Sequence, residues 1–315
     1  MTEALPTLRP PKPVSQPPPP PIAAPPTPPR ASNVRLRVGG PALDRHLAMA
    51  MEALHAEQLS AAPTFKTRVV DVENISFTLH EKTSQEQSAA SFAMQHRALP
   101  ATDMTGLRLW NCSLCLVQCL MSPTELPHMS TKLGRPLRIV ELGAGTGLLG
   151  LAVANRLERS SEVVLTDPDV AIGGGRTSLD VLRANIEANV AKSPSAAAAK
   201  LLWGSAHDIA ALVDRYGVFD VAVGSELLYC EDSVAALAET VVELGVAMCV
   251  LAQQTRPAGN VAIEEAFIRL MEDSGYVSSQ QQIEGTTAVI HRFERAGAGP
   301  QSQSAKVTDL QTSLQ

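Results

Sequence analysis

The sequence predicts an α/β protein with a Rossmann-like, doubly wound sheet that is mostly parallel. From residue 137 onward, short apolar segments typical of buried strands alternate with segments of helical length. The first of these strands runs directly into a glycine-rich turn, LGAGTG, at residues 142–147. A glycine turn between a strand and a helix is typical of ligand-binding sheets of this kind. These two observations define the fold class.

The elements of this sheet are expected at regular spacing along the chain. Strands are predicted at 137–145, 162–169, 200–204, 219–229 and 246–254, and a closing hairpin at 276–283 and 286–295. Helices are predicted at 148–159, 178–190, 231–244 and 261–275. Right-handed crossovers between parallel strands then place helices on both faces of the sheet.

The two ends of the chain are predicted to be disordered. Thirteen of the 23 prolines lie in residues 1–30, and the run PPPPP at 17–21 favours polyproline II. We therefore expect a Pro-rich disordered tail at 1–33, with an SH3/WW-type contact as a weak further expectation. A second disordered tail is predicted at 296–315.

An N-terminal extension is expected at 34–105, ahead of the main domain at 106–295. Residues 43–60 hold good helix formers without Gly or Pro, so they predict a helix. Residues 65–81 carry β-branched and aromatic residues around a turn-like Glu-Asn pair, which predicts a hairpin.

Charge and hydropathy exclude several function classes. The net charge is −6, but residues 1–37 carry +4, so the remainder carries −10. An acidic body lacks the basic footprint of a nucleic-acid-binding protein. There is no run of about 18 apolar residues and no secretory signal pattern, so neither a membrane span nor a signal peptide is expected.

The cysteines and histidines do not form a metal-binding pattern. The five cysteines are an odd, scattered set, which favours a reducing compartment: Cys112, Cys115, Cys119, Cys230 and Cys249. We expect the C-x-x-C in this set to be small apolar residues on one helix rather than zinc ligands. His207, Asp208 and His291 have no ligand spacing, so no metal is expected. A monomer in the cytoplasm is predicted, with the nucleus as an alternative.

Candidate binding residues follow the first two strands. Glu141 ends the first strand, and the loop after it contains Gly143, Ala144, Gly145 and Gly147. Glycines at alternate positions allow a tight turn and the close approach of a ligand. The second strand ends in Asp167, 20 residues beyond the last of these glycines. An acid at this position suits the hydroxyls of a ribose.

Two ligand classes compete for this loop. Gly145, Gly147 and Gly150 match the G-x-G-x-x-G dinucleotide fingerprint. However, Gly143 occupies the place of the turn glycine, and Glu141 would repel a pyrophosphate. A ligand with a ribose and a positive charge but no phosphate fits better, and S-adenosylmethionine is such a ligand.

The end of the fourth predicted strand carries the cofactor-binding candidate Ser225 and the acceptor-side candidates Glu226 and Tyr229. Glu226 and Tyr229 are three residues apart just past a buried strand, so both are expected to face the same crevice. Glu226 is a candidate to hold a lysine ammonium group. The two tryptophans, Trp110 and Trp203, are candidates to line the cofactor pocket, although core packing is an equal alternative for both.

These motifs together resemble a known family. G-x-x-x-W at 106–110, ELGAGTG at 141–147, TD at 166–167, LWG at 202–204 and SELLY at 225–229 occur in order. The chain resembles the seven-β-strand, class I S-adenosylmethionine-dependent methyltransferases, and in particular the methyltransferase-like protein-lysine methyltransferases of the family 16 branch.

The resemblance implies a seven-stranded sheet with an antiparallel last strand. It implies cofactor contacts from Trp110, the loop from Glu141 to Gly147, Asp167, Trp203 and Ser225. It also implies that Glu226 and Tyr229 stand at the substrate entrance and that the substrate is a lysine of a protein partner. This chain departs from the family pattern in having Glu226 where many relatives have Asp, and in an apparent insertion at 170–177.

Three alternatives remain open at this stage. The same fold serves methyltransferases that act on arginine, histidine or small molecules. A catalytically silent scaffold, which binds partners through its Pro-rich tail, is the second alternative. A nicotinamide-dependent Rossmann enzyme is the third.

Overall fold

The computed structural model describes residues 65–72, 74–82, 107, 109–157, 161–255 and 261–297. All of them belong to the second of two compact units, Met51–Gln315. The predicted N-terminal tail, the helix predicted at 43–60 and the C-terminal tail beyond Gly297 lie outside the described residues. Among the helices that are described, none is long and apolar enough to span a membrane.

A seven-stranded sheet forms the centre of this unit, in the order β10-β11-β9-β8-β3-β4-β7. Its strands are β3 (Arg138–Glu141), β4 (Glu162–Asp167), β7 (Ala196–Lys200), β8 (Val221–Ser225), β9 (Met248–Gln254), β10 (Tyr276–Gln282) and β11 (Ala288–Arg295). The first five are parallel, whereas β11 runs antiparallel to both β9 and β10. The predicted sheet with an antiparallel last strand is thus confirmed, and the strand order reverses between β3 and β8.

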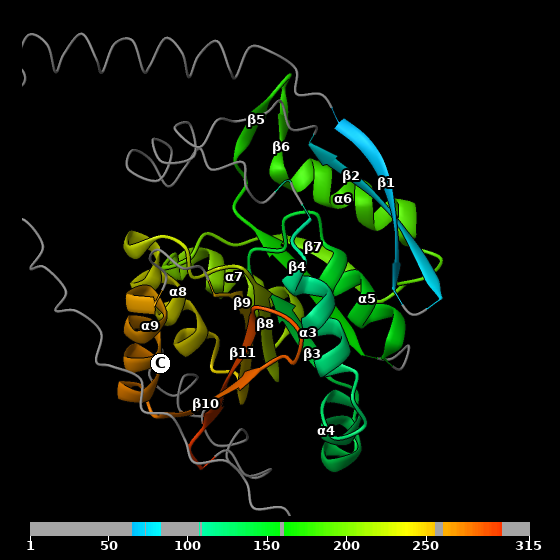
Figure 1. The fold of residues 1–315 in the computed structure, drawn as a ribbon. Helices are drawn as coiled ribbons and strands as arrows, with labels where there is room; N and C mark the ends of the chain where they lie inside the picture. The colour runs from blue at the N-terminus through cyan, green and yellow to red at the C-terminus, as the bar shows by residue number, and fades with distance from the viewer. Residues whose placement is uncertain are drawn as a thin grey trace, which may run out of the picture. The chain divides into compact units, whose positions relative to one another are not determined.

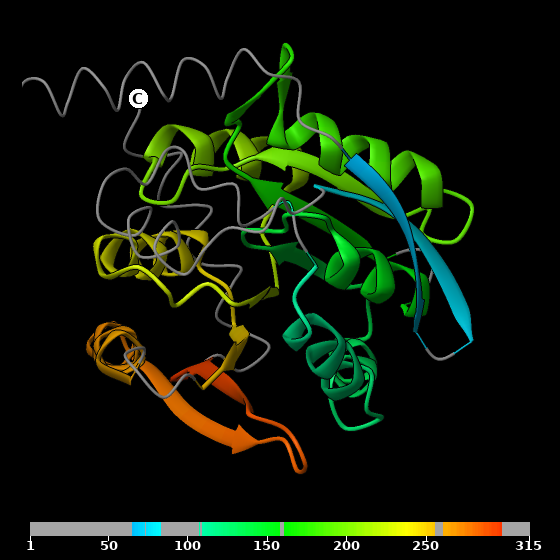
Figure 2. The same cartoon turned by 45° about the horizontal axis from the view of Figure 1, so that its top comes forward.

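Helices cover both faces of the sheet (Figures 1 and 2). One face carries α3 (Cys112–Leu120), α5 (Leu148–Arg156) and α6 (Ser178–Asn189), and the other carries α7 (Ala206–Tyr216), α8 (Glu231–Leu244) and α9 (Val261–Asp273). Side chains of β4 alternate between the two cores: Val163 and Leu165 pack on the α5 side, and Val164 packs on the α8 side. The result is a three-layer α/β architecture.

Two predicted strands have wrong boundaries, and two helices were not predicted. The third strand is Ala196–Lys200 rather than 200–204, and the LWG motif lies in the turn that follows it. Alanine is a weak strand former, so the apolar Leu-Leu-Trp run looked more strand-like. Pairing with β4, from Val163–Ala196 to Asp167–Lys200, holds this edge strand in place. The fourth strand ends at Ser225 rather than at residue 229, and neither α4 (Leu126–Leu133) nor α7 was predicted.

The hairpin predicted at 65–81 is confirmed. β1 (Phe65–Val72) pairs antiparallel with β2 (Ile75–Lys82) in a separate two-stranded sheet that lies along α6 (Figures 1 and 2). The apparent insertion at 170–177 also forms a ribbon, of β5 (Ala171–Gly173) and β6 (Arg176–Thr177). Two glycines with positive φ, Gly174 and Gly175, make its turn.

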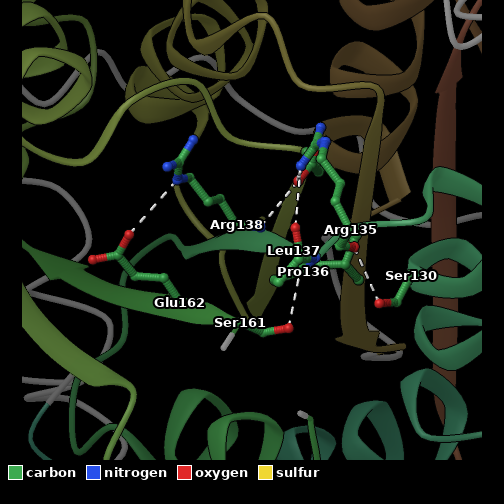
Figure 3. A network of polar contacts seen from close by, with 8 residues as sticks. Ser130, Arg135, Pro136, Leu137, Arg138, Ser161 and Glu162 are labelled. Atoms are coloured by element: carbon green, nitrogen blue, oxygen red, sulfur yellow. Dashed lines mark hydrogen bonds and ion pairs between the residues drawn. The ribbon is translucent and has the colours of Figure 1, made fainter. Parts of the chain in front are cut away.

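A polar network ties the amino ends of the central strands together (Figure 3). The guanidinium of Arg135 donates two hydrogen bonds to the buried carboxylate of Asp220, at 2.6 and 2.9 Å. The backbone N–H of Arg138 donates a third to the same carboxylate, at 2.9 Å. Asp220 directly precedes β8, whereas Arg138 begins β3, so the carboxylate fixes the relative position of the two central strands.

We expect Arg135→Ala to destabilise the protein by about 2 kcal/mol, because it leaves a buried carboxylate with its backbone donor but without its cation. This figure is below that for a fully buried pair because Arg135 is 44% exposed. Urea unfolding followed by circular dichroism measures the change.

The matched control is Arg138→Ala, three residues away. Its guanidinium pairs with Glu162 at 3.7 Å, and both side chains are exposed to solvent (Figure 3). Loss of such a pair should cost about 0.5 kcal/mol or less. Equal destabilisation by the two substitutions would contradict the assigned importance of Asp220.

Candidate functional site

The candidate site lies at the carboxyl ends of the strands, where the strand order reverses between β3 and β8. Gly143, with φ of +58°, marks the point where three segments meet. A Cβ atom on Gly143 would lie 2.8 Å from Leu227 Cδ2 and 3.1 Å from Trp203 Cζ2. The glycine loop after β3, the turn after β7 and the segment after β8 therefore come together, as the sequence motifs predicted.

Asp167 holds the glycine loop against the end of β4. Its Oδ2 accepts a hydrogen bond from the backbone N–H of Gly145 at 2.9 Å, and the N–H of Ala144 donates to the carbonyl of Thr166 at 2.8 Å. The carboxylate is 9% exposed, and burial raises the pKa of Asp167 to about 6. One oxygen of Asp167, the residue predicted to bind a ribose, thus holds the glycine loop in place.

Glu141 lies beneath the loop rather than along it. Its Oε2 accepts a hydrogen bond at 2.9 Å from the N–H of Gly150, the third residue of α5. The N-cap of α5 is Gly147, which has no side chain to cap the helix, so the carboxyl from β3 does this instead. Burial, together with the neighbouring Asp167, raises the pKa of Glu141 to about 8. The sequence analysis did not anticipate this capping contact.

These two carboxyl groups also bear on the dinucleotide alternative. A pyrophosphate at this place would need free backbone amides at the start of α5. The amides of Gly145 and Gly150 are already bonded to Asp167 and Glu141. The predicted repulsion between Glu141 and a pyrophosphate is weak, because a carboxyl with a pKa of about 8 is mostly protonated at neutral pH.

The turn that carries Trp203 is fixed from both sides. Leu202 N–H donates to Asp208 Oδ2 at 3.0 Å, and Gly204 N–H donates to Thr240 Oγ1 at 2.8 Å. The indole ring is half-buried, but its Nε1 is fully buried and has no hydrogen-bond partner among the described residues. An unpaired buried donor is costly, so it points to a missing acceptor.

Sequence reasoning missed Asp208 and Thr240 as supports of this turn. Asp208 is the third residue of α7, and its own N–H donates to the N-cap Ser205. The S-x-x-D spacing predicts the start of a helix but not the contact with Leu202. Thr240 lies on α8, and no sequence pattern predicts its contact with Gly204. Among the described residues, no cluster has the composition of a metal site.

The end of β8 brings the acceptor-side candidates to the same place. Ser225 Oγ lies 2.8 Å from Ser113 Oγ, which joins β8 to the start of α3, just after the half-buried Trp110. Glu226 adopts a left-handed conformation with φ of +57°, which is uncommon for residues other than glycine. Such local strain is often found at functional sites.

The carboxylate of Glu226 is buried and bonded to the end of β9. It accepts hydrogen bonds from the N–H of Gln254 at 3.1 Å and from Nε2 of Gln253 at 3.3 Å. Gln253 in turn accepts from the N–H of Leu228 at 3.1 Å. Tyr229, three residues on from Glu226, is half-buried. The catalytic assignment of Glu226 and Tyr229 stays a prediction, and the structure adds a network that fixes the segment between them.

A seven-stranded sheet with one antiparallel strand, and a glycine loop held by two acids at the switch point, define the Rossmann-like methyltransferase class. Comparison with known proteins then narrows the class. A model of the lysine methyltransferase family matches residues 100–274, which is more than half of the chain. The chain therefore belongs to the lysine methyltransferase family.

Several characterised relatives are similar to this chain. Protein N-lysine methyltransferase METTL21A of Mus musculus is 35% identical over 135 residues, which cover 42% of this chain and 52% of that protein. EEF1A lysine methyltransferase 3 of Mus musculus is 25% identical over 172 residues, which cover 54% of this chain and 66% of that protein. The matches thus span between about half and two thirds of these relatives.

Among solved structures, an O-methyltransferase family protein from Burkholderia thailandensis aligns with a TM-score of 0.43 at 11% sequence identity. The alignment covers 81% of this chain and 85% of that chain.

The buried carboxyl of Glu141 predicts a pH dependence of stability. Its pKa rises from 4.5 in the unfolded chain to about 8 in the folded protein, so the folded protein holds a proton that the unfolded chain has released. The free energy of unfolding should therefore fall as the pH rises between these values, by at most about 1.4 kcal/mol per pH unit.

Glu141→Gln should reduce this fall, because the amide oxygen still accepts from Gly150 but no longer titrates. The clearest window is pH 6 to 8, above the pKa of Asp167 at about 6. Urea unfolding of the ligand-free protein at several pH values measures both slopes. Parallel profiles for the two proteins would show that Glu141 is ionised in the fold.

Proposed function

We propose that this protein is an S-adenosylmethionine-dependent methyltransferase that methylates lysine side chains of a protein substrate. The observation that carries this proposal is the glycine loop itself. Its amides at Gly145 and Gly150 are bonded internally to Asp167 and Glu141, which favours a phosphate-free ligand over a dinucleotide. Membership of the lysine methyltransferase family supports the reaction type.

The residues at the site fit S-adenosylmethionine. The positive φ of Gly143 lets the chain turn at the site, and the carboxyl of Asp167 at the end of β4 suits a ribose. The buried N–H of Trp203, which has no acceptor among the described residues, offers a donor. Trp110 and Ser225 complete the set from the α3 side. When bound, the cofactor supplies an electrophilic methyl group on a sulfonium sulfur.

The acceptor side of the site is assigned to Glu226 and Tyr229. A lysine amine attacks only after it has lost its proton, so the protein must bind the ammonium form and then allow deprotonation. A carboxylate and a phenol hydroxyl are suitable groups to hold a lysine ammonium. The hydrogen bonds from Gln253 and Gln254 hold the Glu226 carboxylate in one orientation, which favours positioning as the main source of rate.

The kind of substrate follows from the relatives and from charge. The names of the two relatives described above specify a protein N-lysine methyltransferase and an EEF1A lysine methyltransferase. The acidic body of this chain complements a basic protein surface. We propose a protein substrate on these grounds, and we propose that the enzyme is a monomer in the cytoplasm or nucleus. Five free cysteines support a reducing compartment.

Cofactor binding is tested first with S-adenosylhomocysteine, with NAD as the competing ligand. Calorimetric titration should give binding of S-adenosylhomocysteine and none of NAD. Asp167→Asn should weaken this binding by about 10- to 100-fold, because it removes the charge facing the ribose but keeps an acceptor for Gly145.

Asp169→Asn is the control for that substitution, since Asp169 is an exposed acid two residues further on. It should leave the affinity within about twofold, because exposed charges contribute little. Binding of NAD alone would overturn the proposed cofactor, and equal losses in the two variants would overturn the assignment of Asp167.

The acceptor-side assignment is tested by Tyr229→Phe and Glu226→Gln. Each keeps the shape of the side chain while removing the hydroxyl or the charge. We expect methyl transfer to fall at least about tenfold with the affinity for S-adenosylhomocysteine nearly unchanged, since only the transfer step is affected. Transfer of radiolabelled methyl groups to proteins of a lysate measures the rate.

Mass spectrometry of the labelled proteins then separates the alternatives. Methyl groups on lysine support the proposal, whereas groups on arginine, histidine or small molecules would favour the related reactions. A protein that binds the cofactor but labels nothing would favour the scaffold alternative.

A further inference from the structure

The β1–β2 hairpin is attached to the rest of the protein in an unusual way. It forms its own two-stranded sheet, and no third strand among the described residues extends its inner strand β2. Two buried asparagines of α6, Asn185 and Asn189, bond to the backbone of β2 instead. They are four residues apart, so both lie on one face of the helix.

Each asparagine pairs with one residue of β2 as a neighbouring strand would. Asn189 accepts from the N–H of Thr78 at 2.9 Å and donates to its carbonyl at 2.7 Å. Asn185 accepts from the N–H of His80 at 2.7 Å and donates to its carbonyl at 3.2 Å. Thr78 and His80 are two residues apart, so their backbone N–H and carbonyl groups face the same edge of the strand. The side chains thus satisfy the edge of β2.

The two asparagines differ in where their second amide proton goes. Asn189 donates it to the carbonyl of Asn185 within the same helix, at 2.7 Å. Asn185 donates it to the carbonyl of Thr146 in the glycine loop, at 2.9 Å. Thr146 is buried, and its neighbour Gly147 has φ of +84°. One side chain therefore joins the hairpin directly to the turn that enters α5.

A second contact joins the hairpin to the other side of the candidate site. Glu81 on β2 is buried and pairs with Lys66 at 2.9 Å on β1. Its other oxygen lies 3.4 Å from the N–H of Leu109, the residue before Trp110. The pKa of Glu81 lies below its ordinary value. Burial acts to raise it, but the hydrogen bonds from Lys66 and Leu109 and the positive charges of Lys66 and Arg68 together outweigh that effect. The carboxylate therefore stays ionised and accepts from both Lys66 and Leu109 at neutral pH.

We propose that the β1–β2 hairpin sets the conformation of the glycine loop, and that Asn185 is the positioning residue through which it does so. Among the described residues, the side-chain amide of Asn185 bonds to backbone groups of the hairpin and the loop. Docking of β2 orients the amide of Asn185, and that amide in turn holds the carbonyl of Thr146. Its consequence for cofactor affinity rests on the function proposed above.

The matched pair Asn185→Ala and Asn189→Ala tests this proposal. Each variant loses the two hydrogen bonds to β2, but only Asn185→Ala loses the bond to the loop. The first measurement is hydrogen exchange of the full-length protein without ligand, followed by mass spectrometry of peptides from 74–82 and 142–150. Exchange reports local opening, so the two segments can be compared within one molecule.

We expect the hairpin peptide to exchange faster in both variants. The loop peptide should exchange at least about fivefold faster in Asn185→Ala and within about twofold of the wild-type rate in Asn189→Ala. Wild-type exchange of the loop in Asn185→Ala would overturn the proposal, and equal acceleration in both variants would overturn the assignment of Asn185. If Asn185→Ala does not fold, Asn185→Asp against Asn189→Asp replaces the pair, because aspartate keeps the acceptor and removes the donors.

The second measurement is calorimetric titration with S-adenosylhomocysteine. Its dissociation constant should rise about tenfold in Asn185→Ala and less than about twofold in Asn189→Ala, since only the former loosens the loop. Wild-type affinity in Asn185→Ala would overturn the link from the hairpin to the site. If the wild-type protein does not bind S-adenosylhomocysteine, the proposed function fails, while the exchange of the loop still decides the role of Asn185.

Discussion

The site depends on how a loop of small residues is held in one conformation at the switch point of the sheet. Glycines permit the turn but do not specify it. Specification comes from two buried acids at the ends of adjacent strands, Glu141 on β3 and Asp167 on β4, which bind the amides of Gly150 and Gly145. Because each acid lies at the end of a strand, the sheet fixes the position of the loop.

The same logic extends outward from the loop. Asp208 and Thr240 fix the turn that carries Trp203, and the glutamines at the end of β9 fix the segment that carries Glu226. The turn with Trp203 and the segment with Glu226 are thus each supported by partners on other elements. Loops that bind ligands can be precise when a scaffold supplies such partners.

Much of this was predictable from the sequence, and the remainder was not for physical reasons. The alternation of apolar segments predicted the sheet and most of its helices, although not α4 or α7. Motifs at strand ends predicted that Gly143, Asp167, Trp203 and Ser225 would converge. The edge strand β7 was placed wrongly because its alanines have low strand propensity. The hydrogen bonds that support the site were not predicted, because partners such as Gly204 and Thr240 are 36 residues apart and sequence patterns reveal only local contacts.

The attachment of the hairpin by side-chain amides has a consequence for how the family can diversify. A strand added to the main sheet must match its register, and a slip of one residue turns every side chain to the opposite face. The hairpin has its own register, set between β1 and β2 alone. Accessory segments of this kind can therefore lengthen, shorten or change their outer surface while the chemistry-bearing sheet keeps its alignment.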